Sequence, residues 1–174
     1  MMVSTRGLPA LAVLAGIAMA MVMPPAQAQE VKTIGKFRDW TAYTHDEGGN
    51  TVCYVATRPT EEEGNYTRRD EVFAIVSHRP AEGARNVVSF IAGYEFKDGS
   101  EVSVSVDGRR DFTLFTHGDA AWAYDEDDAK LVDAMKAGSQ MVVKGTSSRG
   151  TLTTDSYSLM GFTNAHSAIS SACP

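Results

Sequence analysis

A short stretch of strictly alternating residues constrains the fold of this chain most. Residues 100–106 read SEVSVSV, so the three valines point to one side of an extended strand and the polar residues point to the other. Asp-Gly pairs stand directly before and after it, at 98–99 and 107–108. Asp-Gly between apolar runs favours a tight hairpin turn, because both central residues of that turn need positive φ. The pattern predicts a meander in which residues 87–96 and 112–116 pair with this strand on either side.

Several other segments have the composition of strands or helices. β-Branched and aromatic residues predict further strands at 37–43, 51–57, 71–77, 140–144 and 151–160. Helices are predicted from Asp127 or Asp128 through Lys136, with Gly138 as the stop, and at 163–171. Many short strands separated by turns predict a mainly all-β fold, namely a β-sandwich of jelly-roll-like form with one or two short helices.

The N-terminus has the three parts of a secretory signal peptide. Arg6 precedes an uncharged apolar run at 8–23, and Ala-Gln-Ala at 26–28 is a small-x-small cleavage site. A retained membrane anchor is the alternative, but the apolar run is shorter than the roughly 20 residues that span a bilayer. We therefore expect residues 1–28 to be removed between Ala28 and Gln29. The remaining residues 29–174 form a single domain with no membrane span, in the periplasm or secreted.

The two cysteines, Cys53 and Cys173, both lie in the part that follows the cleavage site. In an oxidising compartment a lone pair of cysteines tends to form a disulfide, so we predict a bond that ties an early strand to the C-terminus. The chain-entropy model assigns so long a loop a stabilisation on the order of 5 kcal/mol, as an upper figure. A metal site is disfavoured because no histidine stands near either cysteine at ligand spacing.

The charge balance excludes one class of partner. The chain has 16 basic and 22 acidic side chains, a formal net charge of −6. Proteins that bind nucleic acid need a basic face to neutralise phosphates, so we expect no nucleic-acid partner.

The search for catalytic chemistry gives one weak candidate. The chain has no nucleophile elbow, no zinc-binding HExxH helix and no calcium loop, and the glycine-rich segment 145–151 lacks the lysine of a phosphate loop. His117 and Asp119 are separated by one glycine, which would allow an acid–base pair. A loop histidine beside an aspartate is usually a surface feature, however, and we predict no enzyme, no metal and no cofactor.

Arginines offer a second kind of site. If the sheet brings Arg79, Arg85 and Arg149 to one edge, their forked donors would bind an anionic group. Ordinary solvation and pairing with the many acidic residues is the more common fate of surface arginines. Trp122 and Tyr124 alternate with alanines and are expected to be buried packing rather than a ligand platform.

The residues also resemble a known family, the invasion-associated locus B proteins, which are exported proteins of alphaproteobacteria. The resemblance covers nearly all of the mature chain, and it depends on the order and spacing of many short motifs. These motifs lie at 37–43, 52–54, 77–80, 93–96, 106–108, 115–122, 131–138, 143–151 and 157–162.

The resemblance implies a β-sandwich, an envelope or secreted location and, in some pathogens, a link to entry into host cells. Some family members have further cysteines, where this chain has Thr44 and the segment 116–121, so only one disulfide is expected here. The resemblance supplies no catalytic residues.

Three hypotheses of function follow. The first is a non-enzymatic periplasmic or secreted protein that binds another macromolecule, an envelope component or a host-cell component. The second is a small-ligand module that binds anions through the arginines, or a ligand along the Trp122–Tyr124 strand. The third is an enzyme that uses His117 and Asp119. We rank them in this order.

Overall fold

The structure, a computed structural model, describes residues 30–174. The predicted signal peptide and its cleavage site at Ala28 and Gln29 lie outside the described residues. The elements are β1 (Lys32–Phe37), β2 (Trp40–Glu47), β3 (Asn50–Thr57), β4 (Glu61–Gly64), β5 (Phe73–Arg79), a 3-10 turn η1 (Pro80–Glu82), β6 (Ala84–Ile91), β7 (Glu101–Val106), β8 (Arg110–His117), β9 (Ala120–Trp122), α1 (Asp125–Ala137), β10 (Gln140–Thr146), β11 (Leu152–Ser158) and α2 (Phe162–Ala172).

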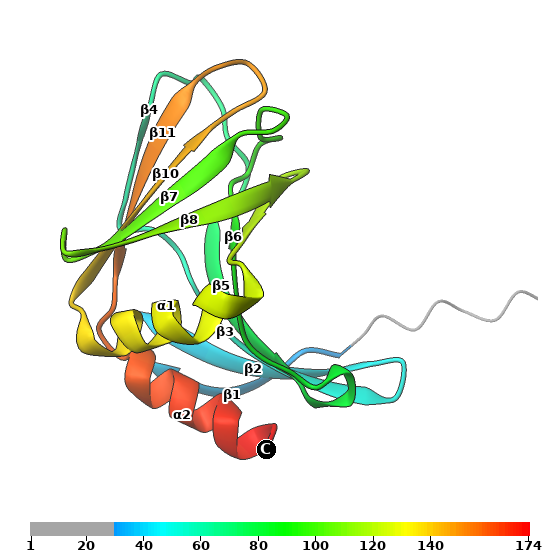
Figure 1. Cartoon of the computed structure of the whole chain (residues 1–174). Helices are drawn as coiled ribbons and strands as arrows, with labels where there is room; N and C mark the ends of the chain where they lie inside the picture. Colours follow the sequence, from blue (N-terminus) through cyan, green and yellow to red (C-terminus); the bar gives the residue numbers. More distant parts are fainter. Residues whose placement is uncertain (1–29) are drawn as a thin grey trace, which may run out of the picture.

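The named strands form one continuous antiparallel sheet. Their order across the sheet is β1-β2-β3-β5-β6-β9-β8-β7-β10-β11-β4. Figure 1 shows the sheet curving strongly, from β4 and β11 at the upper left to β1 and β2 at the bottom. Because of this curvature the sheet has a concave inner face, which holds the core, and a convex outer face.

The two halves of the sheet face each other across the core. The ring of Phe90 on β6 lies 6.0 Å from that of Tyr157 on β11, although four strands separate β6 from β11 within the sheet. The indole of Trp40, fully buried at the start of β2, donates a hydrogen bond to the carbonyl oxygen of Ser158 at 2.9 Å. The predicted fold class, mainly β with two short helices, is confirmed, and its two facing layers belong to a single sheet.

The alternating strand is confirmed as β7, but the predicted meander is only half right. All three valines of β7 are buried, and the turn to β8 has positive φ at Asp107 and Gly108, as the hairpin requires. The other neighbour of β7 is β10, whereas β6 pairs with β9. The reason lies after β6: Phe96 bridges to Ser147, and the chain crosses to the end of β10 before β7 begins.

Two strand predictions need correction at their boundaries. The segment 37–43 is not one strand, because Arg38 takes positive φ and turns the chain from β1 into β2. The segment 87–96 forms a strand only as far as Ile91. The edge strand β4 consists of three glutamates and a glycine, so its composition does not predict a strand.

The two helices were placed correctly by their apolar spacing. Leu131, Val132 and Met135 of α1 are buried as predicted. The predicted cap is wrong, however, because α1 begins at Asp125 without a side-chain cap. Asp128 is instead buried and accepts a hydrogen bond from the Val88 backbone N–H at 2.8 Å, which ties α1 to β6. Neither helix in residues 30–174 is long and apolar enough to cross a bilayer.

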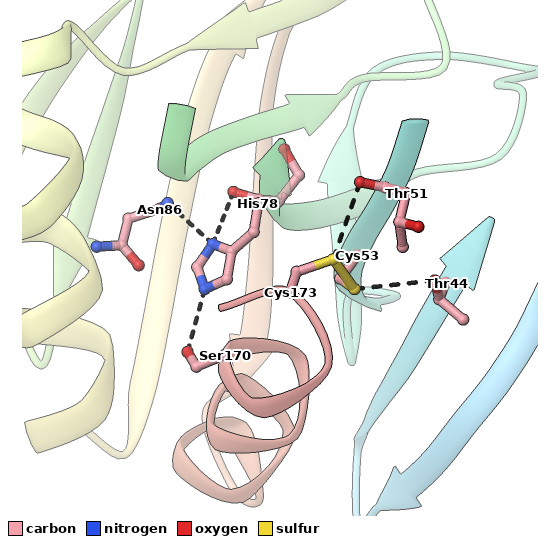
Figure 2. Close-up of a disulfide and its surroundings, with 8 residues drawn as sticks. Thr44, Thr51, Cys53, His78, Asn86, Ser170 and Cys173 are labelled. Atoms are coloured by element: carbon pink, nitrogen blue, oxygen red, sulfur yellow. Dashed lines mark hydrogen bonds between the residues drawn. A yellow bond between two sulfur atoms is a disulfide. The ribbon is translucent and has the colours of Figure 1, made fainter. Parts of the chain in front are cut away.

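The predicted disulfide between Cys53 and Cys173 is confirmed, and it anchors the end of α2 to β3 (Figure 2). Both cysteines are buried, and their Cα atoms lie 6.0 Å apart. At the other end of α2, Phe162 packs edge-on against Trp40 with ring centroids 4.8 Å apart. The helix therefore covers the inner face of the first strands and is held at both ends.

A closed ring of four hydrogen bonds holds the middle of α2 (Figure 2 shows three of its residues). The Asn86 N–H donates to His78 Nδ1 at 3.1 Å, and His78 Nε2 donates to Ser170 Oγ at 3.1 Å. The Ser170 hydroxyl donates to His166 Nδ1 at 3.5 Å, and His166 Nε2 donates to Asn86 Oδ1 at 2.8 Å. Every donor in this ring has an acceptor only when both imidazoles are neutral.

The surroundings of the two histidines favour this neutral state. Burial lowers the pKa of His166 to about 4, and the charges of Lys136, His78 and Arg85 act in the same direction, opposed by Asp133. Burial also lowers the pKa of His78, with Arg85 and Lys136 adding to it, while the nearby Ser77 carbonyl raises it. The ring is therefore intact at neutral pH and becomes unfavourable in acid.

We expect the free energy of unfolding to fall as the pH drops from about 6.5, where an unfolded histidine titrates, to about 4. In this pH window His166 binds a proton in the unfolded chain but not in the folded protein. The free energy of unfolding therefore falls by on the order of 3 kcal/mol across the window. Asp128 acts in the opposite direction, because burial raises its pKa to about 6. We would compare urea unfolding of His166→Gln with that of the unaltered protein at several pH values. Because both proteins retain Asp128, the difference between them gives the contribution of His166.

The free energy of unfolding of His166→Gln should change less with pH over this window. His117→Gln, a substitution at an exposed histidine, should keep the original pH dependence. Identical pH profiles for all three proteins would show that the ring does not couple to folding.

Candidate functional site

A groove opens at the end of the molecule away from α2, where three connections meet. They are the β4–β5 connection (65–72), the β6–β7 connection (92–100) and the β10–β11 loop (147–151). The hollow between them has a volume of about 670 Å³. A second hollow of about 740 Å³ adjoins it, and the two share six lining residues: Arg68, Arg69, Asp70, Gly93, Tyr94 and Glu95. We call the two hollows together the groove.

A buried ion pair forms the base of the groove. The Arg69 guanidinium donates two hydrogen bonds to the Asp155 carboxylate on β11, both at 2.6 Å, and its Nε donates to the Ala92 carbonyl oxygen at 2.5 Å. The side chains of Arg69 and Asp155 are only 3% and 6% exposed. Burial alone would lower the pKa of Arg69, but the hydrogen bonds and charge of Asp155 outweigh it and raise that pKa. The guanidinium is therefore charged, and its hydrogen bonds join the β4–β5 and β6–β7 connections to β11.

Two tyrosines stand on this base. The guanidinium of Arg69 lies over the rings of Tyr94 and Tyr66, 5.0 and 5.7 Å from their centroids. The Tyr94 hydroxyl also shares a 2.6 Å hydrogen bond with Thr153 Oγ1. Burial raises the pKa of Tyr94, although Thr153 and Arg69 lower it, so the hydroxyl stays protonated. Tyr94 is thus held both at its hydroxyl and at its ring, and Tyr66 is held at its ring by the guanidinium.

Gly93 permits the close approach of two of the connections. Its φ is +68°, and a Cβ at this position would lie 2.3 Å from the Asp70 carbonyl oxygen. The Asp70 N–H donates to the Gly93 carbonyl oxygen at 3.0 Å, which keeps the two backbones in contact. Only glycine satisfies both the left-handed backbone and this distance.

The rim of the groove carries charges of both signs. Nη2 of Arg68 lies 3.8 Å from Oδ1 of Asp70, and both side chains are largely exposed. Arg149 and Glu95 also line the hollow, and neither makes an ion pair within the described part of the chain. The rim therefore offers both hydrogen-bond donors and acceptors to solvent.

The three arginines predicted as an anion site do not come together. Arg149 lines the groove, but Arg79 and Arg85 lie at the opposite end of the β5–β6 hairpin. Arg79 is paired with Glu47 at 2.7 Å and with Glu82 at 3.1 Å. The hypothesis fails because the antiparallel pairing of β5 with β6 carries those two side chains away from the three connections.

The other predicted residues lie outside the first hollow. Asp119 lines the second hollow, but His117 lines neither, and no hydrogen bond joins the two side chains among residues 30–174. Tyr124 is exposed rather than buried, and its ring packs against Phe115, 5.2 Å between centroids. Neither Trp122 nor Tyr124 lines the groove. Within the same residues, no group of three or more His, Cys, Asp and Glu side chains could hold a metal ion.

Comparison with known proteins gives the chain its family. The sequence model of the family described as "Invasion associated locus B (IalB) protein" matches residues 40–170. The chain belongs to the IalB family. The family resemblance seen in the sequence is therefore confirmed, and the matched range includes every segment that lines the groove.

A solved structure resembles this IalB protein in fold. The crystal structure of invasion associated protein b from Bartonella henselae matches with a TM-score of 0.56 and 20% sequence identity. The match covers 84% of this chain and 97% of the Bartonella chain. At this identity the likeness establishes the fold alone. No curated protein matches the chain.

We expect Gly93→Ala to destabilise the protein and to open the groove. The added Cβ would clash with the Asp70 carbonyl oxygen and would strain a left-handed backbone, so a loss of about 2 kcal/mol or more in the free energy of unfolding is expected. Urea denaturation measures this loss. Gly99→Ala is the control, because Gly99 has a similar φ of +67° but no atom within 4 Å of its Cβ position. Equal losses in the two variants would show that the contact with Asp70 contributes nothing.

Proposed function

We propose that this IalB protein is an exported, non-enzymatic binding protein, periplasmic or secreted, that captures an envelope or host-cell component in the groove. Three observations support the proposal. The chain belongs to a family whose members are extracytoplasmic, its first 28 residues have the pattern of a signal peptide, and its disulfide suits an oxidising compartment.

The observation that carries the proposal is the Arg69–Asp155 pair. Removing two charges from water is costly, and apolar residues of similar volume would stabilise a core as well or better. A fold that only needed stability would gain little from this pair. Its hydrogen bonds instead hold the β4–β5 and β6–β7 connections against β11, and its guanidinium lies over two tyrosine rings beside an open hollow. Such preorganisation lowers the cost of binding a ligand.

The positions of the histidines support a role in binding rather than in catalysis. His78 and His166 use their ring nitrogens in the hydrogen-bonded ring under α2, away from the groove. The groove itself is lined by arginines, carboxylates, tyrosines and hydroxyls without a nucleophile–base pair. The name of the Bartonella protein associates it with invasion, and a host-cell component is one of the two kinds of partner that we propose.

A small anion is the second candidate ligand. Arg149 favours it, because this side chain lines the hollow and has no carboxylate partner among residues 30–174. The acceptors Asp70 and Glu95 on the same rim disfavour it.

The proposal is tested by capture with a matched pair of variants. Residues 29–174 are immobilised and exposed to envelope extract or host-cell surface extract, and retained components are compared with those on Ser148→Trp and Asn50→Trp. Ser148 lines the groove, so an indole there should block it and abolish specific retention. Asn50 is exposed at the far end of β3, so Asn50→Trp should retain the same components as the unaltered protein. Retention that is the same on all three proteins, or absent from all, contradicts the proposal.

A further inference from the structure

The groove combines aromatic rings with polar groups of both kinds, and this combination narrows the chemistry of its ligand. Tyr66 and Tyr94 supply aromatic surface, and Arg68 and Arg149 supply planar donors. Asp70 and Glu95 supply acceptors, while the exposed side chains of Asn65 and Ser148 supply groups that do both. From this set we infer that the groove binds a saccharide segment, an inference that rests on the proposed binding function.

The mixture of donors and acceptors favours a saccharide over a simple anion. Each sugar hydroxyl both donates and accepts, so it can satisfy an arginine and a carboxylate side by side. Phosphate and sulfate mainly accept, and Asp70 and Glu95 would repel them. A site selective for such anions is built from clustered arginines, as in phosphate recognition. Here one of the three groove arginines, Arg69, is already paired with Asp155 and another, Arg68, lies beside Asp70.

The tyrosines suit the apolar face of a sugar ring. A pyranose has a face of C–H groups, and this apolar face packs on an aromatic ring whose position is fixed in advance. Tyr66 and Tyr94 are held by the same guanidinium, so neither loses much side-chain freedom when a ligand packs on it. Rigid tyrosines are efficient contact residues for this reason.

The shape of the groove favours a chain rather than a single sugar. The first hollow alone lies within the range of about 300–1,000 Å³ that holds small ligands. The second hollow continues beyond the shared wall of Arg68, Arg69 and Tyr94, so an oligosaccharide can extend from one hollow into the next. Both hollows are open to solvent, which admits a segment within a longer polymer.

A titration followed by amide chemical shifts tests the inference. The probes are a neutral tetrasaccharide of N-acetylglucosamine, an acidic tetrasaccharide of galacturonic acid, and sodium phosphate, each added to ¹⁵N-labelled residues 29–174. We expect saturable shifts with at least one tetrasaccharide, confined to 65–70, 93–95 and 147–151. Saturation with the acidic sugar alone would indicate that Arg149 and Arg68 recognise its carboxylates.

Two tyrosine substitutions provide the matched comparison. Tyr66→Ala should weaken the binding of the tetrasaccharide about tenfold or more, because it removes an aromatic wall. Tyr124→Ala, at an exposed tyrosine outside the groove, should leave the affinity unchanged. Both variants should show the amide spectrum of a folded protein, and equal affinities in the two would overturn the role of Tyr66.

The inference is overturned if neither tetrasaccharide gives saturable groove shifts up to about 10 mM, or if phosphate alone does so. Its failure differs from failure of the proposed function. If Ser148→Trp still abolishes capture from extracts while the sugars do not bind, the groove has a ligand of another class.

Discussion

The ion pair between Arg69 and Asp155 is the interaction on which the open end of this protein depends. Arg69 comes from the connection between β4 and β5, and Asp155 from β11 in the facing half of the sheet. The third bond of the guanidinium, to the Ala92 carbonyl, adds the segment that follows β6. One side chain thus sets the spacing of three segments that lie far apart in the sequence. Both charged side chains are buried, so removing Arg69 alone leaves Asp155 without its ion-pair partner, at a cost on the order of 3–5 kcal/mol.

The opposite end of the molecule is held together by buried contacts. There the two helices cover the inner face of the curved sheet, and the disulfide, the hydrogen-bonded ring and the packing of Phe162 on Trp40 all hold α2 in place. The fold therefore separates two tasks: one end supplies stability through buried contacts, and the other presents a preformed hollow between three connections.

The sequence predicted the parts of the fold whose signals are local. The alternating valines of β7, the apolar spacing of the helices and the Asp107-Gly108 turn all depend on neighbouring residues, and the structure confirms them. The predicted pairing of β7 with residues 87–96 is wrong because Asp98-Gly99 has the sequence of a hairpin turn, but of these two residues only Gly99 has positive φ. The disulfide was predictable because the chain contains only one pair of cysteines.

The site was harder to predict, because its residues come from three segments whose proximity is a property of the whole sheet. Of the arginines chosen from the sequence only Arg149 reaches the groove, while Arg69 was one of several arginines with no distinguishing pattern. The sequence did contain a weak signal. Arg69 belongs to an Arg-Arg pair and follows Tyr66 by three residues, and Asp155 is a lone aspartate at an inward position of the polar strand β11. A buried charge can be recognised only when the core around it is known.

Binding by a variant that lacks both charges tests the central claim most directly. In Arg69→Met combined with Asp155→Leu, apolar side chains replace the pair, so the free energy of unfolding should stay within about 2 kcal/mol of the original. We expect this folded variant to lose the groove-dependent capture of envelope or host-cell components, because the guanidinium no longer holds the rings of Tyr66 and Tyr94. If the variant is folded and captures as well as the unaltered protein, or if it fails to fold, the pair does not serve to preorganise a binding groove and the account is contradicted.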